Sequence, residues 1–226
     1  MFQGFSEQTI DFLWGIRLNN HREWFLEHKQ EYLDHVYNPL KELGRELIEA
    51  MEAEMPEDGL QLKVTRIYRD VRRVKYGGLY KDHLWLALRH PGEEEAGRPC
   101  FYFEIYPEGY EYGMGYYCPR PVQMEQYRRR IRRDPKPLEQ LARKLEGQEL
   151  FHLEGEEYKR SKGECPQLLK PWFNRKNITL CTFRQPDGRM TTPELREDIL
   201  AGFRWLKPYY HYFKSLELEP PVTDRF

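Results

Sequence analysis

The sequence predicts an α+β fold, in which N-terminal and C-terminal helices pack on a central antiparallel or mixed sheet. Apolar residues recur every three or four positions through residues 5–55 and through much of 120–215, which is the period of amphipathic helices. Between them, over about 60–118, the period changes to two, which is typical of strands. Helical blocks on both sides of one strand block favour a single domain over residues 1–226.

The N-terminal part is predicted to form three helices. Ser6 is suited to cap the first one. Asn20 and Glu23 have the spacing of a capping box, which predicts the start of a second helix. Pro39 lacks an amide proton and clashes with the preceding turn, so we expect it to end or kink that helix. A third helix, over about 40–54, carries leucines on one stripe.

The alternation of period two predicts a series of strands. The first runs over about 60–71. The apolar run at 84–88 has the length of a buried strand rather than of a helix. Residues 101–106 and 110–116 alternate on either side of a Pro-Glu-Gly turn, in which glycine supplies a positive φ. These two segments therefore predict a hairpin.

The C-terminal part is predicted to be mixed. Pro121 is suited to the start of an arginine-rich helix that ends before Asp134, and a second helix follows over about 138–145. Residues 147–176 show no clear period, and 177–183 have a strand pattern. A last helix is predicted to begin near residue 192, with apolar residues at steps of three and four.

The composition excludes several functional classes. There are 36 Lys and Arg against 37 Asp and Glu, so the formal net charge of −1 argues against a generic nucleic-acid coat and turns attention to local charge. The four cysteines form no CxxC pair, so neither a metal site nor a disulfide framework is expected, and no cofactor motif is present. No signal peptide and no run of 18 apolar residues is found, which predicts a cytoplasmic protein with no membrane partner.

Cationic side chains gather around a glycine pair in the middle of the sequence. Arg66 is predicted to share a strand face with Leu62 and Val64, where an unpaired guanidinium would be costly. Arginine suits phosphate and carboxylate groups, and Gly77 and Gly78 permit close approach of the backbone to an anion. The residues expected to bind the anion are Arg66, Arg69, Arg72, Lys75 and Lys81.

Other side chains are expected to line the same cleft. Tyr68 and Tyr80 would supply hydroxyl groups or stacking surface. Residues of the N-terminal helices could join them, the alternative being a capped amphipathic helix with a core tryptophan. These residues are Asn20, Arg22, Trp24 and Lys29. Asp70 and Glu104 are carboxylates within strand patterns. If the protein is an enzyme, His83 and Asp70 are the candidates for proton transfer.

Nearly the whole chain resembles the uncharacterised bacterial family catalogued as domain of unknown function 2461. The central match consists of the stretch Arg66-Ile-Tyr-Arg-Asp-Val-Arg72, Lys75 and Tyr80-Lys81. The N-terminal match consists of Asn20, Arg22, Trp24, Phe25, Lys29 and Tyr32. Later matches are Gly113–Pro119 and Arg128–Ile131. The sequence departs from the family's usual serine, second lysine and proline at Val74, Gly77 and Leu79. The family has no assigned activity, so the resemblance implies a fold and a site, and no reaction.

Three hypotheses of function remain open. The first is a basic cleft that binds a small molecule bearing a phosphate or carboxylate group. The second is a non-catalytic module that binds RNA or a protein partner through the arginines of residues 128–133, for which a solvated helix face is the alternative. The third is a structural ion-pair network without a ligand. The sequence predicts neither an oligomeric state nor a reaction.

Overall fold

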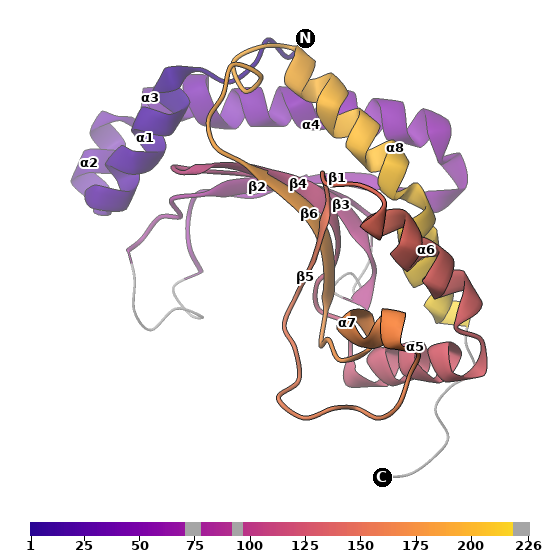
Figure 1. Ribbon diagram of the computed structural model, residues 1–226. Coiled ribbons are helices and arrows are strands. Elements are labelled where there is room, and N and C mark those ends of the chain that lie inside the picture. The colour runs from indigo at the N-terminus through magenta and orange to yellow at the C-terminus, as the bar shows by residue number, and fades with distance from the viewer. Residues whose placement is uncertain (71–77, 92–96, 219–226) are drawn as a thin grey trace. The chain divides into compact units, whose positions relative to one another are not determined.

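The computed structural model describes residues 1–70, 78–91 and 97–218, and it confirms the α+β class (Figure 1). Its strands form one antiparallel sheet in the order β1-β2-β3-β4-β6-β5. The bounds are β1 Gln61–Val64, β2 Leu84–Arg89, β3 Cys100–Tyr106, β4 Gly109–Tyr116, β5 His152–Glu154 and β6 Ile178–Arg184. At the β5 edge, Leu153 pairs with Leu180.

The described chain divides into two compact units, and each is assembled from segments that are distant in the sequence. The first unit comprises Met1–Leu88, Tyr102–Tyr112 and Phe183–Gly202. The second unit comprises Arg89–Phe101, Gly113–Thr182 and Phe203–Phe226. The single domain that the sequence favours stays a prediction.

The helices of the first unit follow one another closely. They are α1 Glu7–Leu18, α2 Arg22–Glu27, α3 Lys29–Glu31, a π-helical segment Tyr32–Tyr37, and α4 Asn38–Glu54. The helix does not end at Pro39, because the chain stays helical through this residue, but it changes from π-helical to α-helical geometry at Asn38, one residue before the proline. Proline leaves the carbonyl four residues earlier without its amide donor, and here Thr9 Oγ1 donates to the oxygen of His35 at 2.6 Å. The donor that proline lacks is thus replaced from α1.

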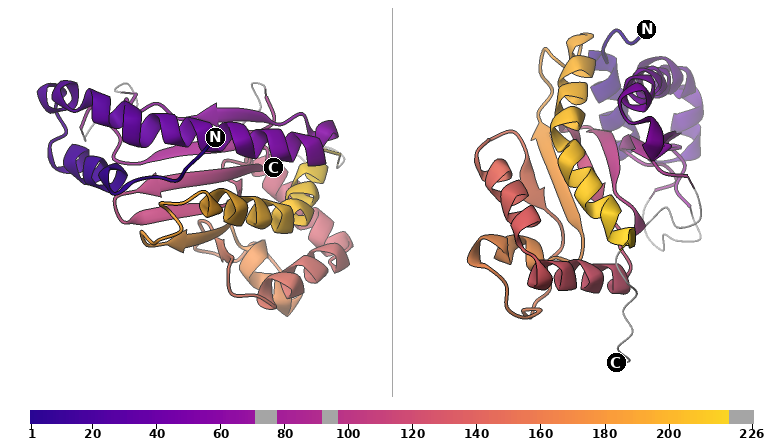
Figure 2. Two further views of the ribbon diagram at one scale, coloured as in Figure 1. Left: turned by 90° about the horizontal axis from the view of Figure 1, so that it is seen from above. Right: turned by 90° about the vertical axis from the view of Figure 1, so that its right-hand side faces the viewer.

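Helix α4 covers one face of the strands in the first unit, as Figures 1 and 2 show. Gly44 permits the close approach, because a Cβ atom there would lie 2.7 Å from Leu62 and 3.3 Å from Leu86. On β3, Phe103 and Ile105 are fully buried, whereas Tyr102, Glu104 and Tyr106 alternate with the buried residues and are only half-buried. The last three side chains therefore define the opposite, polar face of the sheet.

The first strand is shorter than the sequence predicts. β1 ends at Val64, after which the backbone of Lys81 donates to the oxygen of Ile67 at 2.7 Å and a single bridge joins Tyr68 to Tyr80. Ile67 is buried and Arg66 is exposed. Leu62 and Val64 are themselves only half-buried, so the expectation that Arg66 lies on a buried apolar strand face is wrong.

The hairpin of β3 and β4 is confirmed. Gly109, which follows the turn and begins β4, has a φ of +149°. A Cβ atom at Gly109 would lie 2.0 Å from the backbone oxygen of Arg184, so the glycine also permits a close backbone approach.

The second unit contains the arginine-rich helix. Its helices are α5 Pro121–Arg133, α6 Lys136–Glu146, α7 Lys170–Phe173 and the later part of α8 Glu194–Lys214. The stretch expected to be irregular holds β5, α7 and a short 3₁₀ turn, and the strand expected at 177–183 is β6. Within the described ranges, no helix combines the length and the apolar composition needed to cross a bilayer.

Candidate functional site

The predicted basic block is described in part. Arg66, Arg69 and Lys81 lie in the first unit, close to the ends of β1 and β2. Asp70 is exposed and is the last residue before a gap in the described chain. The predicted site residues Arg72, Lys75 and Gly77 lie outside the described residues.

Asn20 fixes the backbone of this segment. Its Nδ2 donates to the oxygen of Tyr80 at 2.9 Å, and its Oδ1 accepts from the amide of Tyr80 at 2.9 Å. The side-chain amide thus pairs with Tyr80 as a neighbouring strand would. A Cβ atom on Gly78 would lie 2.0 Å from Asn20 Oδ1, so glycine is needed there for a steric reason. These two predicted cleft residues therefore position the basic segment.

An aromatic cluster supports the same segment from α2. Phe25, which the sequence analysis did not place in the site, stacks on Tyr80 with ring centroids 4.3 Å apart and lies 5.8 Å from Tyr68. Trp24 stacks on His28 at 4.0 Å and lies 5.6 Å from Phe12. Trp24 is half-buried instead of lying in the core, and the N-cap of α2 is His21, so the expected capping by Asn20 is wrong.

The two other predicted cleft residues of the N-terminal helices are both exposed: Arg22 and Lys29. Burial raises the pKa of Tyr80, and the charge of Arg22 partly opposes this rise. Arg22 therefore lies within electrostatic range of the segment.

The ammonium group of Lys81 has several other cationic residues of the first unit around it. Its Nζ donates to Thr65 Oγ1 at 2.7 Å and to the backbone oxygen of Arg66 at 2.9 Å. Burial lowers the pKa of Lys81, and the charges of Arg69, Lys63 and Arg66 lower it further, whereas Glu104 opposes them. Like charges are therefore concentrated around a partly buried ammonium group. The residues concerned are Lys63, Arg66, Arg69 and Lys81.

Asp82 contacts both Arg17 of α1 and Arg69 of the predicted basic block. Arg17 Nε lies 2.5 Å from Asp82 Oδ2, and Arg69 Nη2 lies 3.5 Å from Oδ1. Arg17 also contacts Glu108 in the β3–β4 turn through both of its terminal nitrogens. Arg69 Nε donates to the oxygen of Tyr80 at 2.7 Å. The guanidinium of Arg69 is thus engaged by protein groups, in agreement with the structural-network hypothesis for this residue.

His83 stands between two carboxylates. Its Nδ1 lies 3.1 Å from Asp82 Oδ1, and its Nε2 lies 3.7 Å from Glu104 Oε1 on β3. The side chain of His83 is 35% exposed and that of Glu104 is 19% exposed, so solvent reaches both groups. Burial raises the pKa of Glu104, and a hydrogen bond from Tyr106 and the charge of His83 offset only part of this rise. Such an arrangement is suited to holding or moving a proton.

Three residues of this site had no role predicted from the sequence: Asp82, Glu104 and Arg17. One signal for Glu104 was available, since it alternates with Phe103 and Ile105 and therefore faces away from the core. No local signal brings Arg17 to Asp82, because the two residues are 65 positions apart.

The arginines of α5 are largely occupied within the second unit. Arg128 is only 3% exposed, and its guanidinium donates to the backbone oxygens of Phe173, Met124 and Arg175 at 3.1, 3.1 and 2.9 Å. Arg130 donates to Ser215 Oγ at 2.7 Å and to the Ser215 oxygen at 2.8 Å. These two side chains therefore stabilise the unit from within.

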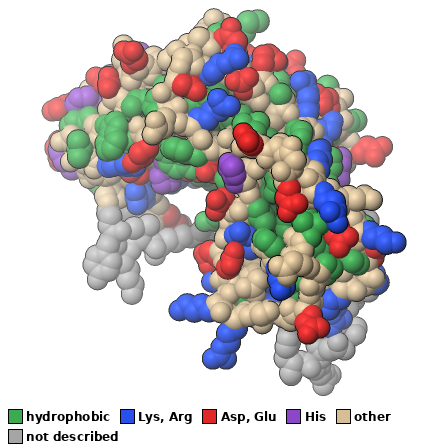
Figure 3. Space-filling view, viewed as in Figure 1, with side chains coloured by type: hydrophobic (Ala, Val, Ile, Leu, Met, Phe, Trp, Pro, Cys, Tyr) green, Lys and Arg blue, Asp and Glu red, His purple; other side chains and the backbone are tan. Residues whose placement is uncertain are grey.

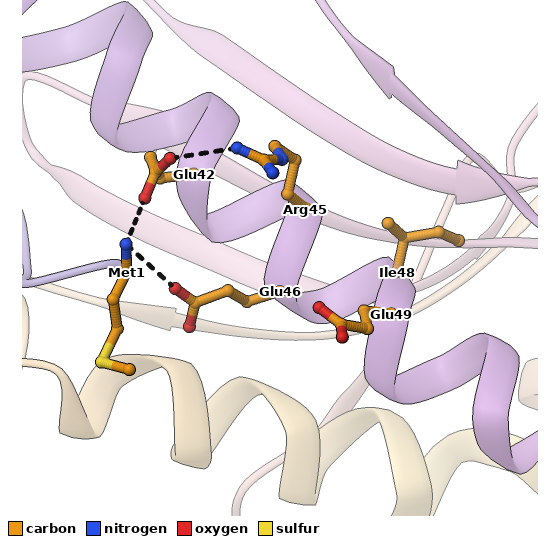
Figure 4. A pocket seen from close by; sticks show the side chains of 6 residues that line it. All are labelled: Met1, Glu42, Arg45, Glu46, Ile48 and Glu49. Carbon is orange, nitrogen blue, oxygen red and sulfur yellow. Dashed lines mark hydrogen bonds and ion pairs between the residues drawn. The ribbon is translucent and has the colours of Figure 1, made fainter.

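A pocket of about 370 Å³ is lined by Met1 and by residues of α4 (Figure 4), where the Met1 amine lies 2.7 Å from Glu42. In the part of the chain that the structure describes, no group of three or more His, Cys, Asp and Glu side chains could hold a metal ion. On the face shown in Figure 3, the basic and acidic side chains of the described residues are interspersed.

The fold and this site define an α+β protein whose sheet presents titratable and aromatic side chains on one face. Residues 8–212 match the sequence model of the conserved hypothetical proteins DUF2461, and the chain belongs to this family. No curated protein shows significant similarity to the chain.

Proposed function

We propose that the first unit binds a small molecule bearing a phosphate or carboxylate group at the cations around Lys81, and that it does so in the cytoplasm. The observation that carries the proposal is the set of charges around the Lys81 ammonium. Arg69, Lys63 and Arg66 all act against its charge, and Glu104 acts in its favour. A bound anion would relieve this repulsion between like charges.

The hydrogen bonds of Lys81 support a fixed position for its charge. Because Thr65 and the oxygen of Arg66 each accept one of its protons, the ammonium group has one more proton to donate. Arg66 is exposed, and its planar guanidinium suits two oxygens of one anionic group. Lys63 lies with its Nζ 5.7 Å from the ring centre of Trp85, which adds an aromatic surface to the same region.

A thermal-shift and calorimetric panel tests the proposal. It contains inorganic phosphate, nucleotides, sugar phosphates, acyl phosphates, and di- and tricarboxylates. A ligand at about 100 times its Kd is expected to stabilise the wild-type protein by about 2.7 kcal/mol, or roughly 5–10 °C. The Lys81→Gln and Arg66→Gln proteins should lose most of this shift. Lys41→Gln, which removes the same charge from an exposed position on α4, should keep it.

Flat melting temperatures across the panel would contradict the proposal. So would equal binding by the wild-type, Lys81→Gln and Arg66→Gln proteins, because the anion would then be held elsewhere.

The hypothesis of an interaction module has less support. Arg128 and Arg130 are engaged by backbone oxygens, as described above, and Arg132 Nη1 lies 3.2 Å from Glu125 Oε1. Salt-sensitive nucleic-acid binding that is lost on charge reversal of Arg129 and Arg133 would favour it over anion binding at Lys81.

A further inference from the structure

Asp82 holds a fixed negative charge next to His83. Burial opposes its ionisation, but hydrogen bonds from Arg17 and His83 outweigh burial and lower the pKa of Asp82. Because an ionised carboxylate only accepts hydrogen bonds, Nδ1 of His83 carries the proton of the 3.1 Å contact. Nε2 is therefore the imidazole atom that gains or loses a proton, and it is the atom that faces Glu104.

The charge of Glu104 is only partly compensated by its neighbours. Burial raises its pKa, and the nearby Glu111 raises it further, against the opposing effects of Tyr106, His83 and Lys81. Glu111 itself accepts a hydrogen bond from Tyr102. His83 Nε2 and Glu104 Oε1, 3.7 Å apart, are thus two neighbouring atoms that can each bind a proton and that are close enough for the charge of one to affect the other.

The same carboxylate conflicts with a bound anion. Glu104 lies within electrostatic range of the Lys81 ammonium, so a phosphate or carboxylate group held by Lys81 would be repelled by ionised Glu104. One proton added to the His83–Glu104 pair removes one unit of negative charge from this region. Anion binding and protonation therefore favour each other, and by linkage the effect is reciprocal.

We propose that the anion and one proton bind together at this site, with the proton carried by the His83–Glu104 pair. This inference rests on the proposed function and adds to it how the site is regulated. The groups that act directly on the pair are Asp82, Tyr106, Glu111 and Lys81. Behind them, Arg17 and Arg69 contact Asp82, Glu108 contacts Arg17, and Tyr102 donates to Glu111.

Sulfate is a suitable probe, because its charge stays constant over the pH range in which the His83–Glu104 pair gains or loses its proton. Isothermal titration calorimetry at constant ionic strength, in buffers of different ionisation enthalpy, measures the protons taken up per sulfate bound. Over the pH range in which the His83–Glu104 pair gains its proton, the wild-type protein is expected to take up close to one proton per sulfate bound. Its affinity should fall about 10-fold for each unit of pH increase across that range.

Glu104→Gln is the decisive variant, since it keeps the size of the side chain and removes its charge. At the upper end of this pH range, Glu104→Gln should bind sulfate several-fold more tightly than the wild type does. The number of protons that it takes up per sulfate should be smaller. Glu49→Gln removes a carboxylate from an exposed position on α4 and should leave both quantities unchanged. In the wild-type protein, the NMR titration midpoint of the His83 imidazole should rise when sulfate is added.

The outcomes separate the two proposals. Absence of sulfate binding at every pH overturns this inference, and if the whole anion panel is also flat it overturns the proposed function as well. Sulfate binding that is lost in Lys81→Gln, but that proceeds without proton uptake and leaves the His83 midpoint unmoved, overturns the inference alone. Full proton uptake in Glu104→Gln, with an unmoved His83 midpoint, assigns the proton to another group and also overturns it.

Discussion

Thr9 supplies the hydrogen bond that Pro39 denies to His35: its hydroxyl donates to the His35 oxygen at 2.6 Å, and Thr9 is fully buried. We expect Thr9→Val to destabilise the protein by about 1–3 kcal/mol, because it removes a hydrogen bond to a partly buried carbonyl oxygen that Pro39 cannot bond. Urea unfolding measures the change. Thr9→Ser keeps the hydroxyl and should cost less, so equal losses for the two variants would contradict this role of the hydrogen bond.

The contact between Gly78 and Asn20 gives a second prediction. A methyl group at Gly78 meets the Asn20 side chain, so Gly78→Ala should cost roughly 1–3 kcal/mol in the free energy of unfolding. Gly188→Ala is a matched control, since a Cβ atom there has no neighbour within 4 Å among the described residues. In an Asn20→Ala background the effect of Gly78→Ala should shrink, and strict additivity of the two changes would argue against the clash.

Arg128 gives a third prediction, for the second unit. Arg128→Met removes a buried guanidinium that donates to three backbone oxygens, so it should destabilise the protein by about 2–5 kcal/mol. Arg132→Met, at a side chain that is 41% exposed, should cost no more than about 1 kcal/mol. Chemical denaturation compares the two. A small effect at Arg128 would mean that its hydrogen bonds contribute little to stability.

The pH dependence of the free energy of unfolding should reveal the contribution of the Asp82 carboxylate. Its pKa is lowered in the folded protein, so its contribution is present above the unfolded pKa of about 3.9 and is lost as the pH falls through the folded pKa. Asp82→Asn should therefore be destabilising near neutral pH, and its deficit in unfolding free energy should narrow as the pH falls below about 4 towards the folded pKa. Unfolding curves over a pH series measure this, and a deficit that is constant down to acid pH would refute it.

The contribution of Glu104 to stability should depend on pH in the opposite direction to that of Asp82. Because burial raises its pKa, its contribution is present below the unfolded pKa of about 4.3 and is lost as the pH rises through the folded pKa. The stability of Glu104→Gln relative to the wild type should therefore improve as the pH rises through that window. The same unfolding series measures it, with Glu49→Gln as the control. An unchanged difference between the wild type and Glu104→Gln would contradict the raised pKa.

The local elements were predictable because their signals are local. The β3–β4 hairpin follows from alternation on both sides of a turn that ends in Gly109, and helices α4 and α5 follow from apolar stripes next to proline. The length of β1 was not predictable in this way. Residues 65–70 continue to alternate in sequence, but the backbone of residues 67–69 pairs with residues 79–81 through a single bridge instead of extending the strand.

The sequence by itself determined the α+β class, the hairpin and the concentration of cations near residues 66–81, because periodicity and charge are properties of neighbouring residues. Only the tertiary structure decided which charges meet. Arg17 reaches Asp82 from α1, and His83 faces Glu104 across neighbouring strands. Pairing at such separations depends on strand register and helix placement, which residue spacing alone does not encode.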